Sequence, residues 1–199
     1  MGTGERISEA EGQALVTLAR QTIAQRLGLP VSPAEEAALG PQLKAPSLQQ
    51  RCGTFVTLKI HGELRGCIGS LVGTDTIVEG VRENAINAAF CDPRFSPLSA
   101  SELDAVAVEV SVLTEPQPLE YRDAADLLAK LRPGVDGLII RQGLAGATFL
   151  PQVWEQLPDP QQFLAHLCLK AGLAMDAWQH GTLTVLTYQV QYFEEGHRG

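Results

Sequence analysis

The sequence predicts an α+β fold in which a mainly antiparallel sheet is flanked by helices, and three observations carry this prediction. Residues 54–71 alternate apolar and polar side chains around His61-Gly62-Glu63, which is typical of a β-hairpin. Residues 8–28 and 76–91 instead repeat apolar residues at helical spacing. Residues 105–113 place four valines on one face of an extended strand. Hairpins and helices in alternating blocks favour packed layers of both kinds.

Size and charge limit the classes of function. The chain has 199 residues, enough for one sizeable domain or two small ones that share an interface. Its net charge of −8 disfavours a protein that binds an extended nucleic-acid backbone, because such binding needs many Lys and Arg contacts. A single nucleotide in a local basic cleft stays open. The sequence has no apolar run of membrane-span length and its N-terminus does not resemble a signal peptide, so we expect a cytoplasmic protein with no membrane partner.

The N-terminal third begins with a helix. Ser8 and Glu11 form a capping-box pattern, and the helix is expected to end near Gly28 and Pro30. Residues 30–52 contain four prolines and are expected to be connecting chain with a short helix at 34–39. A loop of this length often covers something, such as a cleft.

The stretch Leu64 to Gly69 is the centre of the candidate site. In an extended strand, Arg65, Cys67 and Gly69 share one face, whereas Leu64 and Ile68 point into a core with Gly66 between them. Glycines in a strand often mark a close approach of a ligand or of another backbone. An arginine beside a cysteine favours the thiolate. The plain alternative is that Cys67 is a small buried hydrophobe and Arg65 a solvated charge.

Two polar residues lie within apolar patterns. Asn84 falls at the centre of the apolar stripe of the 76–91 helix, where an unpaired amide would cost about 1–3 kcal/mol. We therefore expect Asn84 to anchor a loop or to face a cleft, with a capped loop carbonyl as the equal alternative. Glu109 lies opposite the valines of strand 105–113. Taken alone, that position favours solvent over a site.

The C-terminal half continues with short elements. We expect a helix over 123–131, a hairpin over 138–150, a short helical piece holding Trp154, a helix from Asp159 to Gly172, and one last strand over 183–193. His166 lies on the helix that ends at Gly172, at the edge of its apolar stripe. Residues 194–199 are expected to be a flexible acidic tail.

The cysteine and histidine spacing predicts no structural metal site. Cys52, Cys67, Cys91 and Cys168 form no C-x₂₋₄-C pair, and the four histidines form no H-x-x-x-H pair. Disulfides are disfavoured by the cytoplasmic expectation. The sequence leaves the identity of any cofactor unknown.

Several stretches together resemble one family. They are Leu64-Arg65-Gly66-Cys67-Ile68-Gly69, Asn84-Ala85, Asp92-Pro93-Arg94-Phe95, Glu109-Val110-Ser111-Val112-Leu113, Asp136-Gly137-Leu138, residues 146–154 (GATFLPQVW) and residues 166–172 (HLCLKAG). This set resembles the AMMECR-type domain family, whose bacterial members are called AmmeMemoRadiSam system protein A. The likeness covers about residues 9–195.

The resemblance implies an α+β fold with a larger part formed by both chain ends, a smaller part, and a cleft between them. It implies a single domain over 9–195 of two tightly coupled sub-parts, followed by a flexible tail at 196–199. The Leu64–Gly69 motif would line the cleft. The family's sheet has been likened to nucleotide- and nucleic-acid-binding domains, and an RNA- or base-modifying enzyme has been proposed. The family name implies a pathway shared with Memo-like and radical SAM proteins.

Two functional hypotheses follow. The first is a small enzyme that acts on a nucleotide, a nucleic-acid base or another small anionic metabolite. Cys67 would be the nucleophile, Glu109 the general acid/base if its strand face meets the face of Cys67, and His166 the reserve. The second is a non-catalytic module that binds a ligand or partner. The ligand-binding candidates are Arg65, Gly66, Gly69, Asn84 and Arg94.

Overall fold

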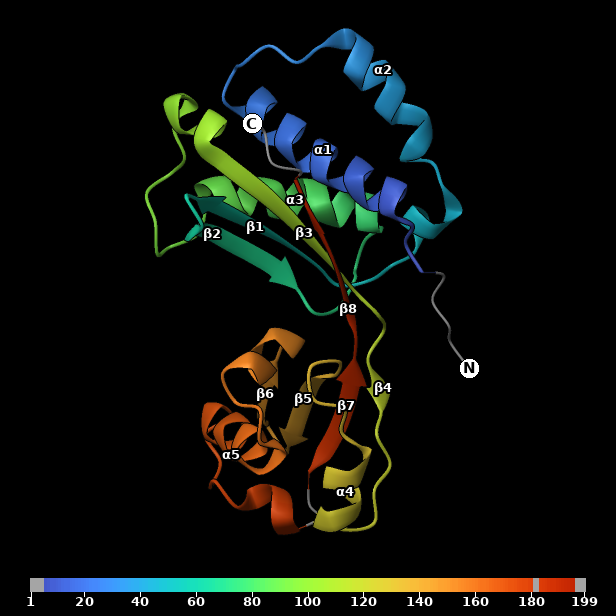
Figure 1. Cartoon of the computed structure of the whole chain (residues 1–199), viewed down its shortest axis with the longest axis vertical. Helices are drawn as coiled ribbons and strands as arrows, with labels where there is room; N and C mark the ends of the chain where they lie inside the picture. The colour runs from blue at the N-terminus through green and yellow to red at the C-terminus, as the bar shows by residue number, and fades with distance from the viewer. Residues whose placement is uncertain (1–5, 181–182, 196–199) are drawn as a thin grey trace. The chain divides into compact units, whose positions relative to one another are not determined.

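The computed structural model of the chain describes residues 6–180 and 183–195 (Figure 1). The chain divides into two compact units. Unit 1 comprises Met1–Glu115 and Gln191–Gly199, and unit 2 comprises Pro116–Val190. Each unit has its own sheet and its own hydrophobic core. The expected tail at 196–199 lies outside the described residues, and the cleft between two sub-parts stays a prediction.

The sheet of unit 1 has four strands in the order β2-β1-β3-β8. Their bounds are Glu63–Ser70 for β2, Thr54–Ile60 for β1, Val106–Leu113 for β3 and Val190–Glu194 for β8. Strand β1 pairs antiparallel with both β2 and β3, so β2 forms an edge of the sheet. The turn between β1 and β2 contains His61 and Gly62, both at positive φ, as a tight hairpin requires.

Helices α1 (Glu9–Arg26) and α3 (Ile77–Phe90) pack on one face of this sheet (Figure 1). The predicted capping box of Ser8 and Glu11 opens α1. Alternating valines on β3 and Val56 and Leu58 on β1 fill the core beneath the two helices. Helix α2 (Pro33–Gln42) lies beside α1 and is longer than the helix expected at 34–39. Short 3-10 turns occupy η1 (Pro46–Gln49) and η2 (Ala100–Ala105).

The sheet of unit 2 has the order β4-β7-β5-β6. Its strands are Gln117–Pro118 for β4, Thr184–Tyr188 for β7, Gly137–Gln142 for β5 and Ala145–Phe149 for β6. Its helices are α4 (Ala124–Lys130) and α5 (Pro160–Lys170), with 3-10 turns at η3 (Pro151–Glu155) and η4 (Ala177–His180). Trp154 stacks on Phe163 with ring centroids 3.7 Å apart, at the centre of this unit's core.

The α+β class with antiparallel sheets is confirmed, but the single strand expected over 183–193 is wrong. The chain forms β7 in unit 2 and β8 in unit 1, with a break at Gln189. The Tyr188 ring packs against Gly137 of unit 2, whereas the Phe193 ring packs against Gly12 of α1. Two aromatic side chains five residues apart therefore pack in different units, which an alternating pattern does not reveal.

The orientation expected for Leu64 is also wrong. A β-bulge at Arg65 shifts the register, so that Leu58 pairs with Gly66 but Lys59 pairs with Leu64. Leu64 therefore shares the face of Lys59 instead of the core, and its side chain is exposed. Within residues 6–180 and 183–195, no helix combines the length and hydropathy that crossing a bilayer requires.

Candidate functional site

The face of the unit 1 sheet opposite α1 and α3 carries a row of polar side chains. Cys67 of β2 pairs with Thr57 of β1, and Thr57 pairs with Glu109 of β3. Directly opposed residues in a sheet share one face, so the register puts Cys67 and Glu109 on the same side with Thr57 between them. We call Thr57, Lys59, Cys67, Glu109 and Ser111 the polar face.

Two side chains bind the backbone of Cys67, and a third contacts its sulfur. Its N–H donates to Asp92 Oδ2 at 2.9 Å, and its carbonyl accepts from Arg94 Nη2 at 3.2 Å. Both backbone groups therefore point away from β1, which makes Cys67 and Thr57 a non-hydrogen-bonded pair with closely spaced side chains. The Thr57 hydroxyl lies 3.4 Å from Cys67 Sγ and donates to it. Cys67 is half-buried.

Glu109 is not in solvent, contrary to the expectation from its strand alone. It is 7% exposed, and Lys59 Nζ lies 2.8 Å from its Oε2. The same ammonium lies 3.2 Å from Glu194 Oε1. Burial raises the pKa of Glu109, and the carboxylate of Glu194 adds to the rise against the lowering effect of Lys59. The position is therefore that of a carboxyl group that retains its proton to a higher pH than an ordinary glutamate.

The exposed edge of β2 carries a second group of charges, the edge cluster of Arg65, Asp92, Arg94, Phe95 and Glu102. Arg65 makes a two-pronged pair with Glu102 at 2.9 and 3.3 Å, and Arg94 lies 2.7 Å from Asp92. Both guanidinium groups lie over the Phe95 ring. The hydrogen bond from Arg65 lowers the pKa of Glu102 to about 2, and Arg94 lowers the pKa of Asp92 strongly.

The edge cluster changes the role expected for Arg65 and Arg94. Glu102 also accepts from the Ser99 N–H at 2.9 Å, so Arg65 is held by a carboxylate that caps η2. The Asp92 and Arg94 side chains satisfy the outward backbone groups of Cys67 on the edge strand. Arg94 is the more accessible guanidinium, with 54% of its side chain exposed.

The remaining ligand-binding candidates lie elsewhere in unit 1. Gly66 faces the helices, where an added Cβ would lie 2.2 Å from the Ala88 carbonyl oxygen of α3. Its lack of a side chain allows β2 and α3 to approach closely. Gly69 and Asn84 line a separate pocket of about 260 Å³. Asn84 is buried, as expected, and its amide donates to the Thr54 carbonyl and hydroxyl at 3.0 and 2.9 Å.

His166 belongs to the other unit. It lies on α5 with an exposed side chain, whereas Cys67 and Glu109 lie in unit 1. Among the residues that the structure describes, no three His, Cys, Asp or Glu side chains come together in an arrangement that could hold a metal ion.

Sequence reasoning gave no role to six residues of these two groups: Thr57, Lys59, Ser111, Asp92, Phe95 and Glu102. Thr57 and Lys59 already fell on the face opposite Val56, but an alternating pattern gives no reason to single out either. Asp92 and Glu102 needed tertiary structure, because each meets its β2 partner across 25 or more positions. The signal that could have found Asp92 is its place after a helix and before Pro93. The proline pushes the backbone of Asp92 out of the helical region, so its side chain no longer follows the helix.

The fold and the site define a class: an α+β protein of two sheet-based units, one of which presents a cysteine and a buried glutamate on the sheet face away from its helices. The chain belongs to the AMMECR1 family, whose model matches residues 16–193. The family resemblance drawn from the sequence motifs is thereby confirmed.

Similar proteins come from several archaea. A protein of Thermofilum pendens is 42% identical over 96% of this chain and 92% of its own length. A protein of Methanothermobacter thermautotrophicus is 41% identical over 95% of this chain and 96% of its own. Among solved structures, the uncharacterized protein PH0010 of Pyrococcus horikoshii matches with a TM-score of 0.79 and 36% identity, covering 96% of this chain and 94% of that one.

Proposed function

We propose that the polar face is the active site of a small enzyme in which Cys67 is the nucleophile and Glu109 the general acid/base. The single observation that carries the proposal is the strand register, which aligns Cys67, Thr57 and Glu109 across three adjacent strands. The pairing distances of antiparallel strands separate the Cα atoms of Cys67 and Glu109 by roughly 10 Å. A substrate that reaches both side chains would therefore lie across Thr57, which stands between them.

Thr57 supports the nucleophile in this proposal. A hydroxyl that donates to sulfur stabilises the thiolate, which is the reactive form of cysteine. The backbone of Cys67 is held by Asp92 and Arg94, so the sulfur is directed from a fixed strand position. Attack by the thiolate forms a bond from sulfur to an electrophilic carbon of the substrate, and the departing group takes a proton.

Glu109 is the proposed source of that proton. Its raised pKa keeps the carboxyl protonated at a pH where an exposed glutamate is ionised. Lys59 then stabilises the carboxylate that remains after proton transfer. Water activated by the same carboxylate would release the product from sulfur and restore the proton.

The substrate class is a nucleotide, a nucleic-acid base or another small anionic metabolite. Arg94 supports this choice, because its exposed guanidinium lies at the rim of β2 and Phe95 beneath it offers a flat surface. Arg65 and Arg94 are each matched to a carboxylate, which argues against long polyanions. The cytoplasmic location expected from the sequence stays part of this proposal.

Alkylation of the native protein tests the nucleophile. With limiting iodoacetamide near neutral pH, we expect peptide mapping to find Cys67 modified before Cys91, although Cys91 is the more exposed thiol. Cys168 is buried in unit 2 and should react last. Solvent exposure alone predicts that Cys91 reacts before Cys67. The order of modification therefore distinguishes an activated thiol from one that is merely accessible. A Cys67 that is protected until the protein unfolds would remove the nucleophile from the proposal.

The matching of the arginines favours a second candidate, a non-catalytic module that binds a ligand or a partner protein. Paired guanidiniums stacked on Phe95 form a stable recognition surface that requires no reactive sulfur. The partners implied by the family resemblance are Memo-like and radical SAM proteins. Native mass spectrometry separates the two: a co-purifying small molecule retained by Cys67→Ser but lost from Arg94→Ala would favour binding without chemistry.

A further inference from the structure

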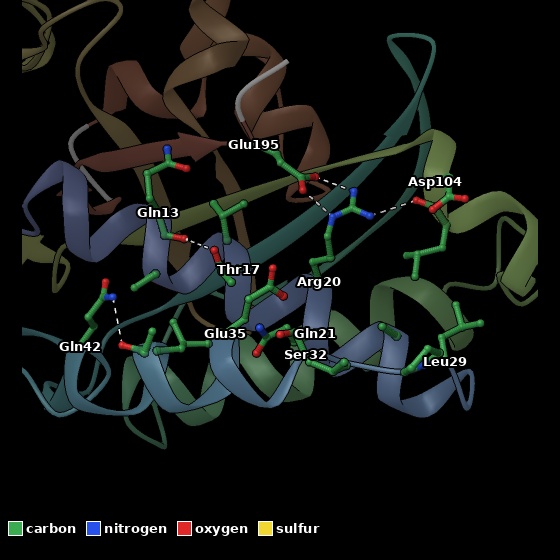
Figure 2. Close-up of a pocket in the computed structure, with 18 of the residues that line it drawn as sticks. Gln13, Thr17, Arg20, Gln21, Leu29, Ser32, Glu35, Gln42, Asp104 and Glu195 are labelled. Atoms are coloured by element: carbon green, nitrogen blue, oxygen red, sulfur yellow. Dashed lines mark hydrogen bonds and ion pairs between the residues drawn. The ribbon is translucent and has the colours of Figure 1, made fainter. Parts of the chain in front are cut away.

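A pocket of about 640 Å³ lies between α1 and α2 in unit 1 (Figure 2), and none of the polar-face residues line it. This volume falls within the range of small-molecule sites. Helix α2 spans the pocket with little packing of its own, since Leu39 is its one buried residue. The pocket is therefore a feature of the helical layer, separate from the proposed active site.

The space exists because the facing helix surfaces carry small side chains. Five of the lining residues on α1 recur at spacings of four and three, which places them on one stripe: Ala10, Ala14, Thr17, Gln21 and Ala24. Four residues of α2 face them: Glu35, Ala38, Leu39 and Gln42. Interiors are normally close-packed, so a stripe that leaves this much volume is open to an occupant.

Gln21 indicates what the occupant must offer. Its side chain is 9% exposed and lines the pocket, and its Nε2 has no hydrogen-bond partner among the described residues. Figure 2 shows it directed toward α2, where Ser32 and Glu35 lie. The neighbouring amides differ, because Gln13 donates to Glu9 and Gln42 to the Ala38 carbonyl. A buried amide donor without a partner is unfavourable unless a ligand or water supplies an acceptor.

The charges of the pocket indicate the sign of the ligand. The charge of Arg20 is matched, since its guanidinium donates to the Leu103 and Val106 carbonyls and forms an ion pair with Glu195, although its Nε makes no hydrogen bond of its own. Glu35 and Asp104 also line the pocket, and neither makes an ion pair with another described residue. The unmatched charge around the pocket is therefore negative, which disfavours an anion and favours a cation.

We propose that this pocket binds a small organic cation that carries an amide or carbonyl oxygen. The oxygen accepts from Gln21 Nε2, and the ammonium or guanidinium group pairs with Glu35. The apolar carbon chain between them lies along the alanines of α1. The proposal requires both ends of the molecule, because Gln21 supplies a donor and Glu35 a negative charge.

Three probes separate these requirements. L-Argininamide, used as its Nα-acetyl derivative so that the guanidinium is its one charge, carries a cation and two amides, 1-butylguanidine a cation alone, and N-acetylglycinamide the same amides alone. In ¹⁵N-labelled whole protein, the Gln21 side-chain amide signal reports binding directly, and the signal missing from Gln21→Met assigns it. We expect L-argininamide to shift this signal and to bind about 5–10-fold more tightly than 1-butylguanidine, the gain of one added hydrogen bond.

Two matched variants complete the test. Gln21→Met keeps the volume and should remove the advantage of L-argininamide over 1-butylguanidine, whose affinity stays unchanged. Glu35→Gln should weaken both cations about 2–5-fold. Glu36→Gln is the control, because Glu36 is the next residue on α2 and lines the smaller neighbouring pocket that Gln21 also borders, but does not line this one. A thermal melt of each variant establishes that it is folded.

The proposal is overturned if no probe shifts the wild-type Gln21 signal at millimolar concentration, since the pocket would then hold water alone. It is equally overturned if N-acetylglycinamide binds as well as L-argininamide, or if Glu36→Gln weakens binding as much as Glu35→Gln. Should Gln21→Met fail to fold, the titrations of wild type and Glu35→Gln still decide the outcome, because they read binding at Gln21 itself.

Discussion

The edge cluster and the polar face are both built from ion pairs, yet they shift carboxyl groups in opposite directions. In the edge cluster the pKa of Glu102 falls to about 2 and that of Asp92 falls further. On the polar face the pKa of Glu109 rises. The two groups lie on the same sheet and share the strand β2, since Cys67 touches both through its backbone and its sulfur.

The difference comes from how many partners each carboxylate has. Asp92 has its own guanidinium and two backbone N–H donors, and Glu102 has Arg65 and the N–H of Ser99. Glu109 instead shares one ammonium, that of Lys59, with Glu194 while being largely removed from water. A carboxylate with its own cation and several N–H donors is stabilised as an anion. A buried carboxylate that shares one cation with a second carboxylate is not stabilised to the same extent.

This comparison assigns different tasks to the two groups. The edge cluster has the properties of a positioning device, because its charges are matched and its hydrogen bonds end on the backbone of Cys67. The polar face has those of a proton-handling site, because its glutamate is poised to change charge. Four changes test this division, and they are ordered by the size of the effect expected.

Asp92→Ala should have the largest effect. The change leaves the Cys67 N–H without its acceptor and the Arg94 guanidinium without its carboxylate. We expect a loss of about 3 kcal/mol in the free energy of unfolding, measured by urea denaturation. Glu79→Ala is the control, since its pair with Arg82 is exposed and 3.8 Å long, and it should change stability little. An equal loss of unfolding free energy in both variants would show that Asp92 does not stabilise the edge strand through Cys67 and Arg94.

The elements that the sequence predicts well are those that depend on local signals. Strand β1 and helices α1 and α3 were predicted closely, because alternation, helical spacing and capping are local signals. The bulge at Arg65 and the break at Gln189 were not. Both depend on which strand lies alongside, and Tyr188 and Phe193 become distinguishable only when Gly137 and Gly12 receive their rings.

For the site, the sequence singled out Cys67 and Glu109. It predicted that they act together on the condition that the polar face of strand 105–113 meets the face of Cys67. The register meets that condition through Thr57. The sequence could not show that Arg65 is matched to Glu102, because those residues are 37 positions apart. Nor could it separate Gly66, which serves helix packing, from Gly69, which lines a pocket, since the difference lies in what approaches each glycine.

Glu109→Gln should have the second largest effect, and its sign depends on pH. Because the pKa of Glu109 is raised in the folded state, the wild-type residue stabilises the fold fully below its ordinary pKa of 4.5 and loses that contribution as pH rises through the folded value. Glutamine does not titrate. The stability of the variant relative to wild type should therefore increase from pH 4 toward neutral pH. Urea titrations at several pH values measure this slope.

Glu102→Gln should give a smaller change with the opposite slope. The folded pKa of about 2 lies below the ordinary value of 4.5, so Glu102 stabilises the fold above pH 4.5 and loses this contribution as pH falls toward 2. Since a third of its side chain is exposed, water screens the pair with Arg65. We expect the variant to be about 1 kcal/mol less stable at pH 7 and equal to wild type near pH 2. Parallel slopes for Glu102→Gln and Glu109→Gln would remove the distinction between the two groups.

Thr57→Val should have the smallest effect, and it tests the sulfur itself. Valine keeps the shape of threonine but cannot donate to Cys67 Sγ, so the thiolate loses one stabilising hydrogen bond. We expect iodoacetamide to modify Cys67 about 3–5-fold more slowly, while the rate at the exposed Cys91 stays unchanged as an internal control. Glu102→Gln is the matched comparison from the edge cluster and should leave the Cys67 rate near that of wild type. If the edge variant slows Cys67 and Thr57→Val does not, the reactivity of the thiol is set by the charges of the edge cluster and not by Thr57, and the binding-module hypothesis takes precedence over catalysis.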